Sequence, residues 1–169
     1  MTIPKEWELL GEKPSDLTIK GSRAETQVRL NSAIGQLDAR LAKDSESAAR
    51  EHLYMTLEEI RGNFDAAALR VFINLPEGAQ SADHRNLLAG TISLYGLRRA
   101  SANHGAGLAS VLDITPVILE LPPNQLLDLN TLRVTIIPHR ELPPQADVVV
   151  GRIRIFGSNM VSTAPHRPE

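Results

Sequence analysis

Apolar and polar residues alternate along most of this chain, and no other feature of the sequence restricts the fold so strongly. Within one run, Leu69, Val71, Ile73 and Leu75 alternate with arginine, phenylalanine and asparagine. Successive side chains of a β-strand point to opposite faces, so one set can be buried while the other meets solvent. The same alternation returns in residues 26–30, 53–57, 91–95, 108–114, 132–136 and 148–155.

Turn-forming residues separate these runs. Proline, glycine and asparagine gather at residues 76–78, 103–105, 122–124 and 143–144, which is typical of tight connections between strands. Short strands with no long helix between them predict an all-β fold. We expect an antiparallel β-sandwich or a jelly-roll-like barrel of roughly seven to eight strands, with one or two short helices.

Two stretches depart from the alternation. In residues 33–50 the apolar residues follow helical spacing among alanine and charged residues, which predicts a short helix or a mobile connection. Thr115 followed by Pro116 is typical of a helix start, because threonine caps helices and proline is tolerated at the first helical position. We expect one or two helical turns over residues 116–121, ended by the two prolines that follow.

The length of 169 residues suits one domain. Residues 1–13 carry few strand signals and are predicted to be an N-terminal connector. The β domain is expected over residues 14–157, and residues 158–169, which contain two prolines, are expected to form a disordered tail. The charged N-terminus does not resemble a signal peptide, so the cytoplasm is the default compartment, with export beside a signal-bearing partner as the alternative.

Composition and charge argue against several classes of function. A net charge of -2 and a pI near 6.2 give no general attraction to nucleic acid or to an anionic membrane. Aromatic residues make up 4% of the chain, too few for a stacking platform for single-stranded nucleic acid. The absence of cysteine excludes disulfides, thiolate metal sites and cysteine nucleophiles. No apolar run approaches the roughly 20 residues that span a bilayer.

Residue patterns typical of catalysis or metal binding are missing. The five histidines include no pair spaced for a shared metal ion on a helix or a strand. Glu58 and Glu59 are adjacent, so on a strand they face opposite ways and are interpreted as a solvated strand end rather than as an acid and base pair. Gly105 and Gly107 indicate a tight turn rather than a phosphate loop. We therefore predict no catalytic residues, no metal ligands and no cofactor in this chain.

Six stretches, taken in order, resemble the C-terminal β domain that follows the di-copper domain in tyrosinases and polyphenol oxidases. They are residues 7–21 (WELLGEKPSDLTIKG), 71–78 (VFINLPEG), 87–96 (LLAGTISLYG), 112–115 (LDIT), 132–138 (LRVTIIP) and 149–156 (VVGRIRIF). The resemblance implies a β domain that packs on a catalytic domain and, in some proenzymes, covers its copper site. In that family six histidines on helices bind the two coppers, and this sequence has no counterpart of those helices. Copper is therefore implied only in a partner.

Two functions from different classes follow. The first is a non-catalytic accessory or shielding domain, or a separate subunit, that packs on a di-copper tyrosinase-like phenol oxidase. Its docking face is expected to include exposed apolar side chains, with Phe72, Tyr95, Leu97 and Ile137 as candidates; ordinary packing within the domain is the alternative for these residues. The second function is a structural jelly-roll subunit of a homo-oligomer. A ligand-binding sandwich and an enzyme with its own site rank below both, because few aromatic residues and no titratable cluster are available.

Overall fold

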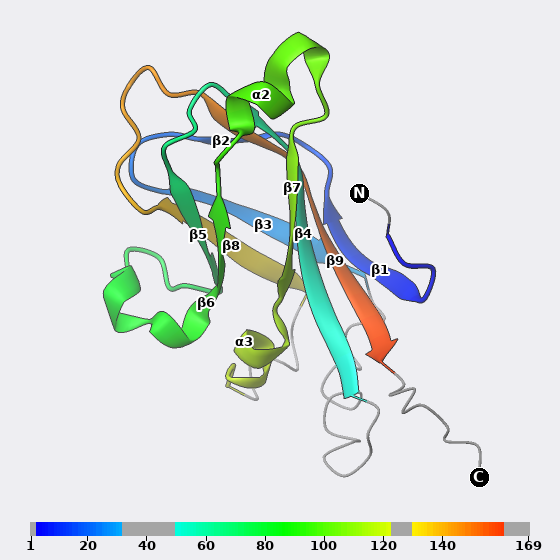
Figure 1. Cartoon of the computed structure of the whole chain (residues 1–169). Helices are drawn as coiled ribbons and strands as arrows, with labels where there is room; N and C mark the ends of the chain where they lie inside the picture. The colour runs from blue at the N-terminus through cyan, green and yellow to red at the C-terminus, as the bar shows by residue number, and fades with distance from the viewer. Residues whose placement is uncertain (1–2, 32–49, 123–129, 161–169) are drawn as a thin grey trace, which may run out of the picture.

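A computed structural model describes residues 3–31, 50–122 and 130–160 (Figure 1). Within these residues the chain forms nine strands, all paired antiparallel in one sheet. The strands are β1 (Trp7–Lys13), β2 (Leu17–Ile19), β3 (Ala24–Leu30), β4 (Arg50–Gly62), β5 (Ala68–Ile73), β6 (Leu88–Ser93), β7 (Leu108–Asp113), β8 (Thr131–Pro138) and β9 (Val148–Met160). The short helices are η2 (Ser81–Asp83), η3 (Arg85–Leu87), α2 (Leu97–Ser101), η4 (Ala102–His104) and α3 (Thr115–Leu119).

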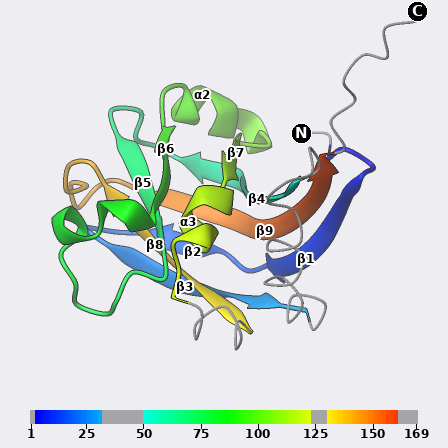
Figure 2. The same ribbon diagram turned by 90° about the horizontal axis from the view of Figure 1, so that it is seen from below.

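The sheet curls into a nearly closed barrel. Its strand order is β6-β5-β8-β3-β1-β9-β4-β7, with β2 paired to β9 beside this path. The two end strands approach each other, since a Cβ atom placed on Gly90 of β6 would lie 2.7 Å from Leu112 Cδ2 of β7 (Figure 2). Glycine at this position lets the Leu112 side chain pack directly on the β6 backbone. The predicted all-β, antiparallel, barrel-like fold is confirmed.

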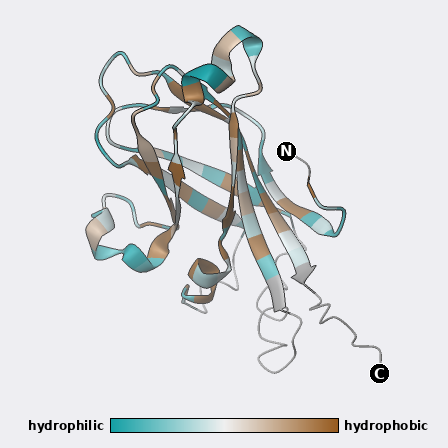
Figure 3. Cartoon of the chain, in the orientation of Figure 1, coloured by the Kyte–Doolittle hydropathy of each residue, from teal (hydrophilic) through white to brown (hydrophobic). Residues whose placement is uncertain are grey.

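The apolar residues of the alternating runs fill the interior of the barrel. Leu69, Val71 and Ile73 are fully buried, and in the register of β5 with β8 they lie opposite Pro138, Ile136 and Val134. Polar and apolar segments follow one another along the strands in Figure 3, as a sheet with one face on a core requires. All seven predicted runs overlap strands of the structure.

The ends of the chain differ from the prediction. Residues 7–13, assigned to a connector, form β1, which pairs with both β3 and β9 and buries Leu10 completely. A register shift between Leu9 and Gly11 interrupts its alternation, which hides the strand in the sequence. At the other end β9 continues to Met160, so residues 158–160 belong to the sheet rather than to a tail. Residues 161–169 lie outside the described residues.

The helical predictions have separate outcomes. The predicted helix or connection at 33–50 lies outside the described residues except for Arg50, which begins β4. The predicted helical turns are present as α3 (Thr115–Leu119), with Pro116 in the first turn. The predicted cap is wrong, because Ile114 is the N-cap and no side chain caps the helix, which ends before the two prolines. Helix α2 was not predicted from the sequence. No helix among the described residues is long and apolar enough to cross a membrane.

Candidate functional site

Two of the four predicted docking residues are buried, so the expectation that they are exposed is wrong. Phe72 points to the outer side of β5 but is 2% exposed, and Thr135 opposite it on β8 is fully buried, which shows that this part of the outer face is covered. Leu97 is not on a strand at all. It begins α2, is fully buried and approaches Gly62, while Arg98 and Arg99 of the same helix are exposed.

The other two predicted residues remain accessible. Tyr95 is 86% exposed in the turn between β6 and α2. Ile137 on β8 is half-buried and packs partly against the core. Their contact with a partner stays a prediction.

Histidines and carboxylates are spread out in the part of the chain that the structure describes. There, no three histidine, aspartate or glutamate side chains come together as metal ligands would. His52 instead pairs with one carboxylate, its Nδ1 lying 3.2 Å from Asp113 Oδ2.

A surface hollow lies near α2, and the amide of Asn63 and the hydroxyl of Ser101 that line it are already hydrogen-bonded within the domain. It has a volume of about 430 Å³ and is lined by Gly62, Asn63, Arg98, Ser101 and Ala102. The Asn63 side chain is already bonded to the backbone at Gln145 and Asp147. The Ser101 hydroxyl donates to the Leu97 carbonyl and accepts from the Gly62 N–H. These hydrogen bonds connect neighbouring segments of the chain, so we interpret the hollow as part of the structure rather than as a ligand site.

A group of aromatic and paired charged side chains lies on the outside of β1, β9, β4 and β7. Leu53, Met55 and Leu57 point from β4 into the core, so the residues between them point outward. We call this surface the aromatic face. Its residues are Trp7, Leu9, Glu12, His52, Tyr54, Thr56, Glu58, Val111, Asp113, Arg152, Arg154, Phe156 and Ser158.

Strand register places these residues in rows across the sheet. One row reads Leu9, Phe156, Tyr54 and Asp113, from β1 to β7. The next row reads Glu12, Arg154, Thr56 and Val111. Apolar and charged side chains are therefore neighbours, close enough to interact across strands.

Four rings form a continuous row on this face. Trp7 stacks on Tyr54, with ring centroids 4.4 Å apart and planes 4° from parallel, although β9 separates their strands. Tyr54 also stacks on His52 at 6.0 Å, and Trp7 meets Phe156 at 5.8 Å with tilted planes. The Arg154 guanidinium lies 5.1 Å from the centroid of the Phe156 ring, within cation–π distance. Burial chiefly raises the pKa of Tyr54, and the charge of Asp113 adds to it.

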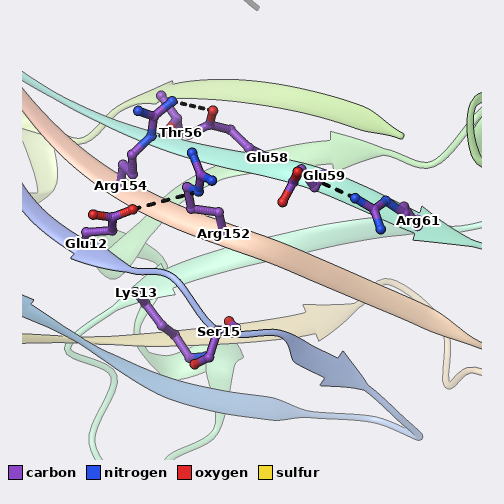
Figure 4. A network of polar contacts seen from close by, with 9 residues as sticks. All are labelled: Glu12, Lys13, Ser15, Thr56, Glu58, Glu59, Arg61, Arg152 and Arg154. Carbon is purple, nitrogen blue, oxygen red and sulfur yellow. Dashed lines mark hydrogen bonds and ion pairs between the residues drawn. The ribbon is translucent and has the colours of Figure 1, made fainter. Parts of the chain in front are cut away.

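Beside the rings, charged side chains neutralise one another (Figure 4). Arg154 donates from Nε and Nη2 to the two carboxylate oxygens of Glu58, and the Thr56 hydroxyl donates to Glu58 Oε2 at 2.8 Å. Arg152 Nε lies 3.7 Å from Glu12 Oε1. The hydrogen bond to Glu58 is the main cause that raises the pKa of Arg154; burial opposes it and is outweighed. The interpretation of Glu58 as a solvated strand end is wrong, because it is 9% exposed and its charge is paired.

A bulge in β4 places the adjacent residues Glu58 and Glu59 in different surroundings. The register of β4 with β7 shifts between Leu57 and Ile60, and Glu59 adopts a left-handed φ of 52°. On β9, a Cβ atom on Gly151 would lie 2.8 Å from the Glu59 Cβ, so glycine is needed beside the bulge. Glu58 thereby stays over the sheet beside Arg154, and Glu59 is exposed next to Arg61.

The aromatic face was not predicted from the sequence. Trp7 and Leu9 lay in the predicted connector, and Tyr54 occupied an outward position of its run. The available signal was an aromatic residue at a position where an isolated sheet would carry a polar one.

Residues 6–158 match the family described as Domain of unknown function (DUF7868). The chain belongs to this family. The match begins just before β1 and ends within β9, so the DUF7868 domain includes eight strands in full and β9 except for its last two residues. No curated protein matches the sequence.

Solved structures show where else this fold of the DUF7868 family occurs. Latent apple tyrosinase is 18% identical with a TM-score of 0.53; the match covers 85% of this chain and 27% of that chain. Recombinantly expressed latent aurone synthase, a polyphenol oxidase, is 13% identical with a TM-score of 0.54, covering 84% of this chain and 25% of that chain. The same enzyme from its natural source is 14% identical with a TM-score of 0.54, covering 82% and 25%. The DUF7868 chain thus has the fold of about a quarter of each of these proteins.

Proposed function

We propose that this chain is a non-catalytic accessory domain that packs on a tyrosinase-like di-copper oxidase domain. The observation that carries the proposal is the extent of the fold match, which takes up 85% of this chain and only 27% of latent apple tyrosinase. A fold that makes up a quarter of an oxidase is a part of it rather than the whole. The oxidation of phenols and the copper ions belong, on this proposal, to the partner domain.

The described surface supports binding to another protein. Tryptophan, tyrosine and arginine are the residues most enriched at the centres of protein interfaces. Trp7, Tyr54 and Arg154 lie on one face of this domain. Trp7 and Tyr54 are held by their stacked rings, and Arg154 by Phe156 and Glu58. A rigid surface loses little conformational freedom on association.

The proposal is tested by affinity capture of the full tagged chain from its native host, with protein identification and metal analysis. We expect a copper-containing oxidase to be recovered in a fixed ratio to the chain. Recovery of the chain alone, as a discrete homo-oligomer without copper, would overturn the proposal in favour of a structural subunit.

Shielding is a finer part of the same proposal and has its own test. The recovered oxidase, freed of the chain, is assayed for phenol oxidation before and after the purified chain is returned. Shielding predicts that activity falls as the chain is added and saturates at one chain per oxidase. Unchanged activity, with binding intact, would leave an accessory domain that does not shield.

A further inference from the structure

We infer that the aromatic face is the surface on which the oxidase domain docks. This inference rests on the proposed function and adds to it the side of the barrel that is used. It begins from the composition of the face. The chain has one tryptophan, two tyrosines and three phenylalanines, and one residue of each kind lies in the row of rings on this face.

Accessible apolar residues extend the row across all four strands. Leu9 on β1 is 40% exposed and Val111 on β7 is 42% exposed, and they lie in adjacent rows on opposite sides of β9 and β4. Trp7, on β1 beside Leu9, and Tyr54, on β4 between β1 and β7, are half-buried. Phe156 (3% exposed) and Thr56 (fully buried) are covered by their neighbours, so the part of this face that a partner can reach is formed by Leu9, Trp7, Tyr54 and Val111. Such a group differs from the scattered single residues that are normal on any protein.

One ion pair on this face is largely removed from water before any partner binds. The Arg154 and Glu58 side chains are 19% and 12% exposed and satisfy each other. A charge that is paired and largely removed from water before binding adds little further desolvation when a partner covers it. An unpaired arginine at the same place would oppose docking.

The outer face of β3 and the turn that carries Tyr95 fit less well. The outward residues of β3 are Glu25, Gln27 and Arg29, all exposed and polar. Tyr95 is a lone exposed ring in a turn. A polar strand face is typical of a surface that meets solvent.

The position of the chain ends favours the oxidase domain as the occupant. Trp7 at the start of β1 pairs with Ser158 near the end of β9, so the polypeptide enters and leaves the barrel at the edge of the aromatic face (Figure 1). In latent apple tyrosinase the matched part is 27% of the chain, so the rest is joined at one or both ends of this fold. A domain attached there lies next to the aromatic face. A second copy of this chain is the alternative occupant.

Photo-crosslinking locates the docking surface without disturbing the fold. The photoreactive residue p-benzoylphenylalanine replaces Leu9 or Val111 on the aromatic face, and Gln27 or Tyr95 elsewhere, one position at a time in the tagged full chain. All four positions are exposed. After irradiation in the native host, we expect crosslinks to a copper oxidase from positions 9 and 111 only.

A matched pair of double variants measures the contribution to binding. Leu9→Lys with Val111→Lys places two lysines on the aromatic face, and Gln27→Lys with Thr91→Lys places two lysines on exposed positions of β3 and β6. We expect the first variant to recover about tenfold less copper oxidase and the second to match the unsubstituted chain. Equal thermal midpoints establish that both variants are folded.

The outcomes separate the two proposals. Retained capture by the Leu9 and Val111 variant, or crosslinks from position 27 or 95, would overturn the aromatic face and leave the accessory function standing. Crosslinks from positions 9 and 111 to a second copy of the chain would identify a homodimer surface instead. Failure of the unsubstituted chain to capture any copper oxidase would overturn the proposed function itself.

Discussion

Arg154 of β9 and Glu58 of β4 form a two-pronged ion pair on the outside of the barrel, in which each carboxylate oxygen accepts a separate guanidinium hydrogen bond. Both side chains are largely buried although they point away from the core. Thr56 completes the pair from the same strand as Glu58, and its own side chain is fully buried. The outer face of these strands is therefore a second, polar layer of packing.

Replacement of Arg154 by methionine tests that layer. Methionine keeps most of the aliphatic stem but leaves the Glu58 carboxylate buried without its partner, and we expect a loss of about 2–4 kcal/mol in the free energy of unfolding. Urea unfolding of the Arg154→Met, Glu58→Gln and double variants gives the coupling between the two side chains, expected at about 1–3 kcal/mol.

The neighbouring pair provides the control. Arg152 Nε and Glu12 Oε1 are 3.7 Å apart, and their side chains are 39% and 37% exposed. Arg152→Met should cost less than about 1 kcal/mol, because water already screens this pair. Equal costs for the two arginine variants would show that burial does not set the strength of the Arg154 pair.

The Glu58 carboxylate makes the free energy of unfolding depend on pH in the acid range. Burial alone raises the pKa of Glu58, but hydrogen bonds from Arg154 and Thr56 and the charges of Arg154 and Arg152 bring it below its ordinary value. A carboxyl whose pKa is lowered in the folded state stabilises the fold above its unfolded pKa, about 4.3 for glutamate, and loses that contribution as the pH falls through the folded pKa.

Urea unfolding at a series of pH values measures this effect. We expect the free energy of unfolding to fall with pH below about 4, and to fall less steeply in Glu58→Gln. Asp113 acts in the same direction: burial raises its pKa, but hydrogen bonds from Thr115 and the contact with His52 outweigh burial and bring the pKa below its ordinary value. Identical slopes for Glu58→Gln and the unsubstituted chain would contradict the role of Glu58.

The strands that the sequence predicts correctly are those whose alternation is unbroken. In β5 every second residue from Leu69 is fully buried, so local pattern and tertiary burial agree. In β1 the register shift after Leu9 breaks the alternation, and polar residues near Lys13 make the strand look like a connector. Helix α2 has five residues, too few for a periodic signal.

The aromatic face could not be predicted because its contacts join distant parts of the chain. Arg154 and Glu58 are 96 residues apart, and Trp7 meets Tyr54 only because β1 and β4 flank β9. Alternation shows which residues share a face of a strand but not whether that face is covered. Phe72 illustrates the limit, since it points outward and is nevertheless buried.

Two glycines with left-handed backbone conformations allow the cost of the conformation to be measured apart from the cost of a steric clash. Gly78 and Gly107 have φ values of 74° and 78°. A Cβ atom on Gly78 would meet nothing within 4 Å, whereas one on Gly107 would lie 2.3 Å from the Ile60 carbonyl oxygen, at the bulge of β4. Gly78→Ala should cost about 1 kcal/mol for the backbone alone. Gly107→Ala should cost at least about 2 kcal/mol more, because backbone must move. Similar urea midpoints for the two variants would contradict the tight contact.

The hydroxyl of Thr115 ties α3 to β4. It accepts a hydrogen bond from the Leu53 N–H at 2.8 Å, and both groups are buried. Thr115→Val keeps the shape of the side chain but leaves that backbone N–H without its acceptor, which should cost about 1–3 kcal/mol. Thr115→Ser keeps the acceptor and loses only a methyl group, so it should cost about 1 kcal/mol.

Hydrogen exchange at the Leu53 amide distinguishes the two losses. We expect faster exchange in Thr115→Val than in Thr115→Ser at equal global stability, because only valine removes the acceptor. Equal exchange rates would show that the hydroxyl does not hold this amide.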